Sequence, residues 1–175
     1  MVNINKAIFF DRDGTLIKTF VSNRNIPKAI KNIKDFKLLS NVKYVIDKLS
    51  KKYKIIIITN QPDVARGKNS KKNVKQINLE LSNSLKIDKI YTCYSDNDKN
   101  YMRKPHPGMI LSAKKKFKLK LEKSYVVGDR DKDIIAGKKA KCRTILINKK
   151  YNNPKILNPD YTIKNFKELL TIIKV

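Results

Sequence analysis

The 175-residue chain is poor in the residues that stabilise small secreted proteins and membrane proteins. It has two cysteines, Cys93 and Cys142, one histidine and no tryptophan. Two cysteines outside a Cys-x-x-Cys motif cannot form a disulfide framework, which favours a reducing compartment. No apolar run approaches the roughly 20 residues that cross a bilayer, and the amino terminus lacks the apolar segment of a secretory signal. These absences predict a cytoplasmic protein without a membrane partner.

Acidic residues are also scarce, since 15 aspartates and glutamates face 41 lysines and arginines, for a formal net charge of +26. A charge of this size is compatible with nucleic acid or another polyanion as a partner. Nearly all of it is lysine spread over every predicted helix, whereas surfaces that clamp phosphates often concentrate arginine. We therefore favour a solvated lysine surface and keep nucleic acid as the alternative partner.

What the chain does contain is an alternation of buried strands and amphipathic helices. Short apolar runs predict strands, and apolar residues at helical spacing predict the helices between them. The expected strands are 7–10, 55–58, 89–93, 125–127 and 144–147, and the expected helices lie within 42–49, 74–85, 107–117, 134–140 and 166–173. The polar segment 18–37 has no repeat, so we expect a loop with a short turn or helix there. This order predicts an α/β protein, a single domain over residues 1–175, with a parallel sheet of about five strands between two helical layers.

The chemistry begins where the first strand ends. Asp11 and Asp13, in the stretch Asp-Arg-Asp-Gly-Thr, place two carboxylates at the carboxyl edge of the sheet, where open α/β sheets bind ligands. Such hard oxygen ligands favour Mg²⁺ shared with a substrate phosphate. Gly14 lets the backbone turn with its amides open to an anion, and Thr15 adds a hydroxyl. For this stretch alone, an ordinary Asp-Gly turn is the alternative interpretation.

Polar residues follow the other predicted strands as well. Thr59 comes after the second strand, Arg103 and Lys104 open the third helix, and Asp129 and Asp133 follow the fourth strand. Because the carboxyl ends of parallel strands meet at one edge of a sheet, we expect these side chains to lie together. A hydroxyl, a lysine and two pairs of carboxylates on one rim predict a site for Mg²⁺ and a phosphoryl group.

The same residues resemble the motifs of the haloacid dehalogenase superfamily. The resemblance covers roughly residues 5–148 and is strongest to its subfamily IIIA, which holds the histidinol-phosphate and heptose-bisphosphate phosphatases. It implies a Rossmann-like hydrolase fold and a phosphatase of carbohydrate metabolism. The segments that carry it are Phe10 to Thr15, Thr59-Asn60-Gln61 with Ala65-Arg66-Gly67, Arg103-Lys104-Pro105 with Pro107-Gly108-Met109, and Val127-Gly128-Asp129 with Asp133.

The resemblance implies a two-step covalent mechanism. Asp11 is expected to attack phosphorus and form an aspartyl-phosphate. Asp13 is expected to protonate the leaving oxygen and then to deprotonate the water that hydrolyses this intermediate. Mg²⁺ is expected on Asp11, on the backbone carbonyl of Asp13 and on Asp129.

Further residues are implied to contact the substrate or to orient those that do. Thr59 and Lys104 are expected to neutralise the phosphate oxygens. Asp133 is expected to orient Lys104 or a metal-bound water, although it also suits the N-cap of its helix. The remaining expected substrate contacts are Gly14, Thr15, Asn60, Gln61, Arg103 and Arg130.

The chain departs from the subfamily pattern in three places. The usual zinc loop before Arg-Lys-Pro retains only Cys93, and one thiol cannot form a tetrahedral zinc site, so we expect no zinc. The segment 18–25 lacks the acidic and Gly-Tyr loop of the heptose-bisphosphate enzymes. Asp63 stands where a glycine is usual. The stretches between the motifs are too short for a cap domain, and we expect an open site on a monomer.

Several functions remain open on this pattern. A sugar (bis)phosphate such as D-glycero-D-manno-heptose 1,7-bisphosphate is the favoured small-molecule substrate, and histidinol phosphate is a related one. A polynucleotide 3′-phosphatase is an alternative because it shares a similar Thr-Asn-Gln-x-x-x-x-Arg-Gly stretch and would suit the net charge of +26. A basic binding protein without catalytic activity is the alternative that is not an enzyme. The presence of Asp11, Asp13, Lys104 and Asp129 argues against it.

Overall fold

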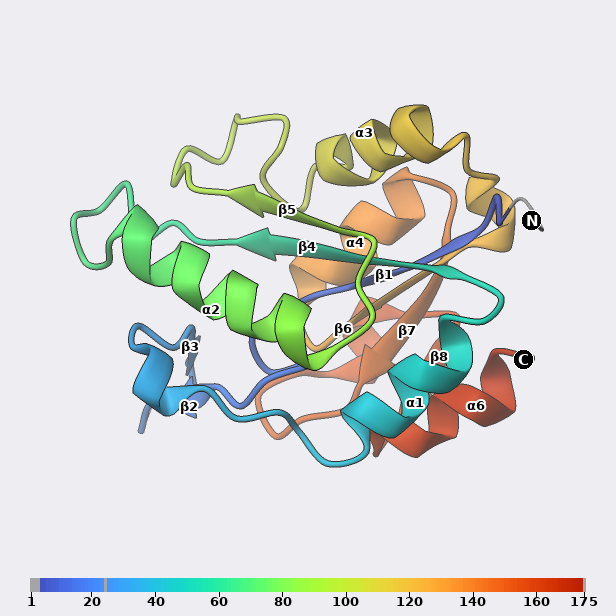
Figure 1. Ribbon diagram of the computed structural model, residues 1–175, viewed down its shortest axis with the longest axis horizontal. Coiled ribbons are helices and arrows are strands. Elements are labelled where there is room, and N and C mark those ends of the chain that lie inside the picture. Colours follow the sequence, from blue (N-terminus) through green and yellow to red (C-terminus); the bar gives the residue numbers. More distant parts are fainter. Residues whose placement is uncertain (1–3, 24, 175) are drawn as a thin grey trace.

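Six parallel strands form the central sheet of the protein (Figure 1). We describe residues 4–23 and 25–174 of a computed structural model. The strand order is β5-β4-β1-β6-β7-β8, and Ile8 of β1 pairs with Ile55 on one side and with Tyr125 on the other. The strands are β1 (Ala7–Phe10), β4 (Lys54–Asn60), β5 (Lys89–Cys93), β6 (Tyr125–Gly128), β7 (Arg143–Ile147) and β8 (Tyr161–Ile163).

Helices cover both faces of this sheet, as the sequence pattern predicted (Figure 1). One face packs against α1 (Val42–Leu49), α2 (Lys71–Ser84) and α6 (Leu169–Ile172), and the other against α3 (Gly108–Phe117) and α4 (Asp131–Lys139). Successive residues of β1 alternate between the two cores: Ile8 and Phe10 join the first, and Ala7 and Phe9 join the second. This burial on both faces is why the strand is wholly apolar. None of the described helices is both long and apolar enough to span a membrane.

The end of the chain differs from the expectation of five strands and one closing helix. Strand β8 is a sixth strand, which pairs with β7 at the edge of the sheet. Only Ile163 of its three residues is buried, so the sequence carries no apolar run there. A four-residue helix, α5 (Pro154–Leu157), precedes it, and the closing helix divides into the 3₁₀ turn η3 (Phe166–Glu168) and α6.

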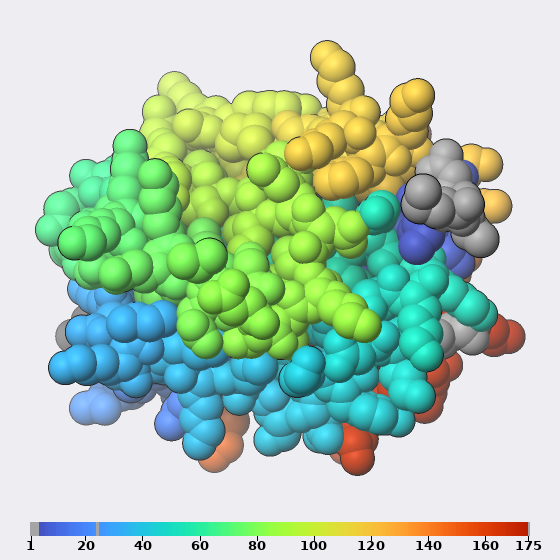
Figure 2. Space-filling view, viewed as in Figure 1, coloured from blue at the N-terminus to red at the C-terminus, as the bar shows by residue number. Residues whose placement is uncertain are grey.

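The segment 18–37 contains the short turn that was expected and, beyond it, a hairpin. Two short antiparallel strands, β2 (Phe20–Val21) and β3 (Pro27–Lys28), form a hairpin, and the 3₁₀ turn η1 (Ile33–Asp35) follows. A further 3₁₀ turn, η2 (Leu121–Lys123), precedes β6. The turn η1 lies against α2, and Figure 2 shows the blue surface of this segment adjoining the green surface of that helix. Two-residue strands are too short to produce a periodic signal.

Candidate active site

The side chain of Lys104 bridges β4, the residue after β1 and the first turn of α4 at the carboxyl edge of the sheet. Its Nζ donates to Oδ1 of Asp11 at 2.7 Å, to Oδ1 of Asp133 at 2.6 Å and to the carbonyl of Ile58 at 2.7 Å. An ammonium group has three hydrogens, so all of its donors are used. Lys104, Asp11 and Asp133 are each buried. A lysine that precedes a helix is therefore drawn into the sheet edge between two carboxylates.

Burial and crowding perturb the ionisation of this cluster. Burial raises the pKa of Asp11 to about 7, with Lys104 opposing the rise and Asp133, Asp129 and Asp13 adding to it. Burial likewise raises the pKa of Asp129 to about 6. Burial alone would lower the pKa of Lys104, but the carboxylates of Asp11 and Asp133 reverse this and raise it. The site thus concentrates negative charge around a lysine that stays protonated.

Asp129 lies deeper, directly after β6, and is held from two sides. The Thr15 hydroxyl donates to its Oδ1 at 3.1 Å, and the Tyr151 hydroxyl donates to its Oδ2. The Asn152 side chain donates to the Asp129 carbonyl at 2.8 Å. Thr15 is fully buried in this contact, so its hydroxyl orients Asp129.

Glycines allow these carboxylates to approach the backbone. Gly14 has a φ of +89°, and a Cβ there would lie 2.3 Å from Oδ2 of Asp129. A Cβ on Gly128 would lie 2.3 Å from Oδ2 of Asp133. Real Cβ atoms essentially never make such short contacts, so a side chain at either position would displace the carboxylate.

The second acid of the motif, Asp13, is fixed by residues from the same edge. Gln61 donates from Nε2 to Oδ2 of Asp13 at 2.9 Å and to the Thr59 hydroxyl at 2.8 Å. The Ile30 amide donates to the other oxygen, Oδ1, at 3.3 Å. Gln61 was expected to contact the substrate, and the structure places its amide on Asp13 and Thr59.

Two other residues that were expected to contact the substrate, Asn60 and Arg103, form hydrogen bonds with the Lys104 backbone and with the preceding loop. Asn60 accepts from the Lys104 amide at 3.1 Å and donates to the Lys104 carbonyl at 2.9 Å. Arg103 is buried and donates to Asp98 at 2.9 Å and to the Ser95 carbonyl at 3.1 Å, which ties down the loop before it. Arg130 is exposed and lies at the start of α4.

The structure overturns the N-cap alternative for Asp133 and shows the partners of Asp63. The helix α4 begins with Arg130 as its N-cap, and Asp133 occupies the third position, where its Oδ2 accepts from the Arg130 amide at 3.1 Å. Asp133 is therefore not the N-cap. The Asp63 carboxylate lies 3.9 Å from Nζ of Lys31 and 3.8 Å from Nη1 of Arg66, so two basic side chains offset its charge.

The acidic cluster fits a divalent cation. Oxygens of Asp11, Asp129 and Asp133 lie within 4.8 Å of one another. Both oxygens of Asp133 accept hydrogen bonds, from Lys104 and from the Arg130 amide, and both oxygens of Asp129 accept them from the Thr15 and Tyr151 hydroxyls. The cluster can thus offer the one or two carboxylates that Mg²⁺ usually takes.

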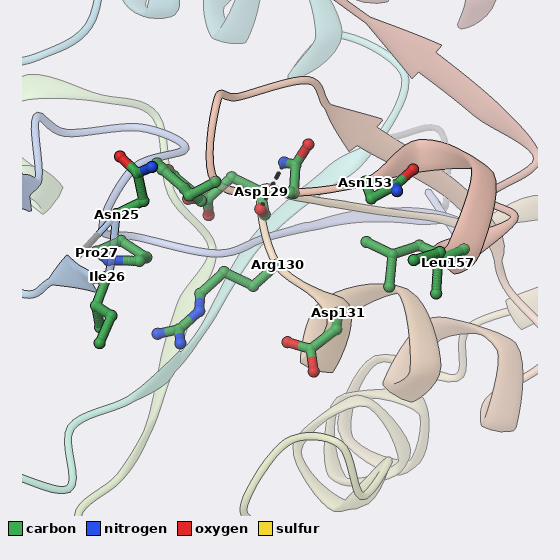
Figure 3. Close-up of a pocket in the computed structure, with 11 residues that line it drawn as sticks. Asn25, Ile26, Pro27, Asp129, Arg130, Asp131, Asn153 and Leu157 are labelled. Carbon is green, nitrogen blue, oxygen red and sulfur yellow. Dashed lines mark hydrogen bonds between the residues drawn. The ribbon is translucent and has the colours of Figure 1, made fainter.

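Two cavities open beside these residues. The smaller, about 60 Å³, is the catalytic cavity, and its lining includes Asp11, Asp13, Thr59, Lys104 and Asp133. The larger, about 290 Å³, is the side cavity between the hairpin residues 25–27 and the segment 151–157. Figure 3 shows Pro27 on one side of it, Leu157 on the other, and Arg130 between them. Pro27 and Arg130 line both cavities, so the two are neighbours.

Three functional contacts were missed by the sequence reasoning. Tyr151 and Asn152 follow β7, where no charged motif marks them, and only the fold brings them to Asp129. Arg12 lies inside the Asp-Arg-Asp motif and is fully buried, with its Nε 2.9 Å from Oδ2 of Asp13. Its position between two expected catalytic acids was the feature of the sequence that could have identified Arg12 as part of the site.

Comparison with known proteins identifies the family of the chain. The sequence profile of the family described as polynucleotide kinase 3 phosphatase matches residues 6–154. A relative from Helicobacter pylori strain ATCC 700392 / 26695, named D-glycero-beta-D-manno-heptose-1,7-bisphosphate 7-phosphatase, is 36% identical over 184 residues, which cover 99% of this chain and 100% of the relative. A relative from Campylobacter jejuni, named as the 7-phosphatase of the alpha anomer, is 33% identical over 97% of this chain and 96% of its own length.

Solved structures share the fold. The structure of D,D-heptose 1,7-bisphosphate phosphatase from B. bronchiseptica, complexed with magnesium and phosphate, superimposes with a TM-score of 0.79. It covers 95% of this chain and 99% of its own, at 22% identity. A haloacid dehalogenase phosphatase from Thermococcus onnurineus superimposes with a TM-score of 0.69 at 16% identity, covering 97% of this chain and 98% of its own.

Proposed function

Because the chain belongs to the polynucleotide kinase 3 phosphatase family, within the haloacid dehalogenase superfamily, we propose that it hydrolyses the 7-phosphate of D-glycero-D-manno-heptose 1,7-bisphosphate. The full-length match to relatives with that named activity supports this substrate. The observation that carries the catalytic part is the buried cluster of Asp11, Asp129 and Asp133 around Lys104. We also propose a cytoplasmic monomer of carbohydrate metabolism, and the two free, buried cysteines support a reducing compartment.

Asp11 is the proposed nucleophile. Lys104 holds its Oδ1, and no hydrogen bond to its Oδ2 occurs within the described ranges. Oδ2 attacks phosphorus, the bond from phosphorus to the substrate oxygen breaks, and an aspartyl-phosphate forms. Lys104 neutralises the charge that collects on the phosphoryl oxygens, with the Thr59 hydroxyl as a donor on the other side. These interactions matter because unaided phosphomonoester hydrolysis is extremely slow.

Asp13 is the proposed general acid and base. It gives its proton to the departing sugar oxygen in the first step. In the second step it takes a proton from the attacking water, so that phosphate leaves and Asp11 is regenerated. Gln61 and the Ile30 amide keep its carboxyl group in one orientation for both transfers.

Mg²⁺ is the proposed cofactor, with the Asp11 and Asp129 carboxylates and the Asp13 carbonyl to hold it. When bound it supplies positive charge beside the phosphoryl oxygens. The raised pKa values of Asp11 and Asp129 reflect burial of acidic groups that a divalent cation would offset. Asp133 orients Lys104. We propose no zinc, since Cys93 packs with apolar residues of the α3 side of the sheet.

The side cavity is the proposed site for the sugar and its distal phosphate. Its volume of about 290 Å³ exceeds that of the catalytic cavity, and it mixes apolar walls with asparagine side chains. Arg130 lies between the two cavities, and no salt bridge to it is present in the described part of the chain. A guanidinium group with free donors there can bind the second phosphate of a bisphosphate. In this proposal the side cavity provides the sugar contacts that the acidic loop, absent from 18–25, provides in the heptose-bisphosphate enzymes.

The test is Mg²⁺-dependent phosphate release from a panel of both anomers of heptose 1,7-bisphosphate, histidinol phosphate and a 3′-phosphorylated oligonucleotide. We expect release from the heptose alone, with ³¹P NMR showing loss of the 7-phosphate and retention of the 1-phosphate. Asp11→Asn is the blank and is expected to be folded and inactive. If no substrate in the panel releases phosphate, or if Asp11→Asn releases as much phosphate as the wild type, the proposal is contradicted.

A polynucleotide 3′-phosphatase is the second candidate function. The description of the matching family and the net charge of +26 favour it. Release from the oligonucleotide that falls steeply with added salt, with no such dependence for a small ester, would replace the sugar substrate with nucleic acid.

A further inference from the structure

The mechanism above leaves Arg12 without a role. It is the middle residue of Asp-Arg-Asp, its side chain is 0% exposed, and it is the largest of the fully buried side chains in the described structure. Burying a guanidinium group is costly, and an apolar side chain of similar size is often as stable or more stable at such a position. Packing alone therefore does not account for an arginine between the two proposed catalytic acids.

The contacts of Arg12 connect Asp13 to the scaffold. Its Nε donates to Oδ2 of Asp13 at 2.9 Å, and its Nη1 donates to Oδ1 of Asn78 at 2.8 Å. Asn78 lies on α2 and donates from Nδ2 to the Thr92 hydroxyl of β5 at 3.1 Å. The buried Nη2 has no partner among the described residues. Within 4–23 and 25–174, Asp13 is thus the one carboxylate in contact with this guanidinium, and the bond to Asn78 holds the guanidinium in place.

These contacts decide which oxygen of Asp13 carries the proton. Oδ2 accepts from Arg12 Nε and from Gln61 Nε2, which occupies both of its lone pairs. Oδ1 accepts only the longer bond from the Ile30 amide, at 3.3 Å, within the described structure. Oδ1 therefore remains for the transferred proton.

Resting on the proposed phosphatase activity, we infer that Arg12 is a positioning residue that directs Oδ1 of Asp13 at the leaving oxygen, with Asn78 as its anchor. The proton moves from Oδ1 to the sugar oxygen as the phosphorus–oxygen bond breaks, and Oδ1 takes a proton from water when the aspartyl-phosphate is hydrolysed. Losing this orientation slows steps that need proton transfer, whereas attack by Asp11 on an ester with a good leaving group is spared.

The test compares an alkyl phosphate with p-nitrophenyl phosphate, whose leaving group needs no proton. For Arg12→Gln we expect kcat on the alkyl ester to fall about 100-fold, the lower end of what general acid–base catalysis contributes. With p-nitrophenyl phosphate the same variant is expected to give a rapid burst of nitrophenol, followed by a slow phase in which phosphorylated Asp11 accumulates. Asp13→Asn should show the same pattern.

Two further variants separate positioning from folding. Asn78→Ala keeps both acids and Arg12, and we expect the same pattern with a loss of about 10-fold. Lys75→Gln on the exposed face of α2 is the surface control. Equal losses on both esters with no burst, in Arg12→Gln and in Asn78→Ala, would overturn the positioning role. If wild type releases no phosphate at all, it is the phosphatase proposal that fails.

Discussion

The Nζ of Lys104 lies 2.7 Å from Oδ1 of Asp11, and both groups are buried at the carboxyl edge of the sheet. The lysine precedes α3, 93 residues away in the chain from the acid that follows β1. This pair, with Asp133 on the other side of the ammonium group, defines the catalytic cavity and leads to the first prediction.

Replacing Lys104 by methionine should damage both activity and stability. The change leaves Asp11 and Asp133 buried without their cation, and breaking a buried ion pair on one side costs about 3 kcal/mol of unfolding free energy. We expect kcat to fall by about 1000-fold or more, since the phosphoryl oxygens lose their cation. Urea unfolding at pH 8 and turnover measure the two effects. Lys115→Met on the exposed face of α3 is the control, and unchanged stability in Lys104→Met would contradict the buried network.

Stabilisation by Mg²⁺ should depend on pH. Without metal, the folded pKa values of Asp11 and Asp129, about 7 and about 6, lie above their ordinary value of 3.8. The native state therefore binds more protons than the unfolded chain between about pH 4 and 7, and its stability falls as the pH rises through that range. At pH 8 both carboxylates are charged, so Mg²⁺ binds without displacing protons.

We therefore expect Mg²⁺ to raise the melting temperature by about 5 to 10 °C at pH 8, as binding at 100 times Kd would. The rise at pH 5 should be less than half as large. Thermal melts with Mg²⁺ and with EDTA at both pH values make the comparison, and Asp129→Asn should abolish the difference. An equal rise at both pH values would argue against these carboxylates as the ligands.

Gly14→Ala should abolish activity. Its Cβ would occupy the place of the Asp129 carboxylate, and its φ of +89° is unfavourable for alanine. We expect at least a 100-fold fall in kcat/KM together with weaker binding of Mg²⁺.

The chain offers a matched control for this change. Gly67 also has a positive φ, +67°, but nothing lies within 4 Å of a Cβ built on it. Gly67→Ala should cost about 1 kcal/mol through backbone strain and leave turnover intact. Similar activity in the two alanine variants would show that the contact with Asp129 is unimportant.

Arg130→Gln tests the side cavity. If Arg130 binds the distal phosphate, KM for the bisphosphate should rise about 10-fold, which is the effect of losing one charge-assisted hydrogen bond. KM for the corresponding monophosphate should change little, and the effect should shrink in high salt. Lys139→Gln, on an exposed position of the same helix, is the control. Equal rises for both substrates would place the second phosphate elsewhere.

Metal content provides an independent measurement. Elemental analysis of the purified protein is expected to show no stoichiometric zinc, because Cys93 and Cys142 are both buried among apolar side chains. Zinc at one equivalent would contradict the proposal.

Much of the fold and the composition of the site follow from the sequence. Apolar runs of three to five residues with helical patterns between them specify buried parallel strands and covering helices. Parallel strands share their carboxyl edge, so the residues after each apolar run, among them Asp11, Thr59 and Asp129, had to lie together. The strand β8 and the hairpin were not predicted. They are short and mostly exposed, so their sequences show no periodic alternation of apolar and polar residues.

Side-chain direction was decided only by the tertiary structure. The sequence offered Arg103, Asn60 and Gln61 as substrate contacts, but a loop carboxylate, the Lys104 backbone and Asp13 are their partners. Arg12 was buried against Asp13 by α2 packing over it, a contact 66 residues away along the chain. Local patterns record which face of an element is apolar. They do not record which distant polar group completes a buried hydrogen bond, and that pairing exists only when the layers pack.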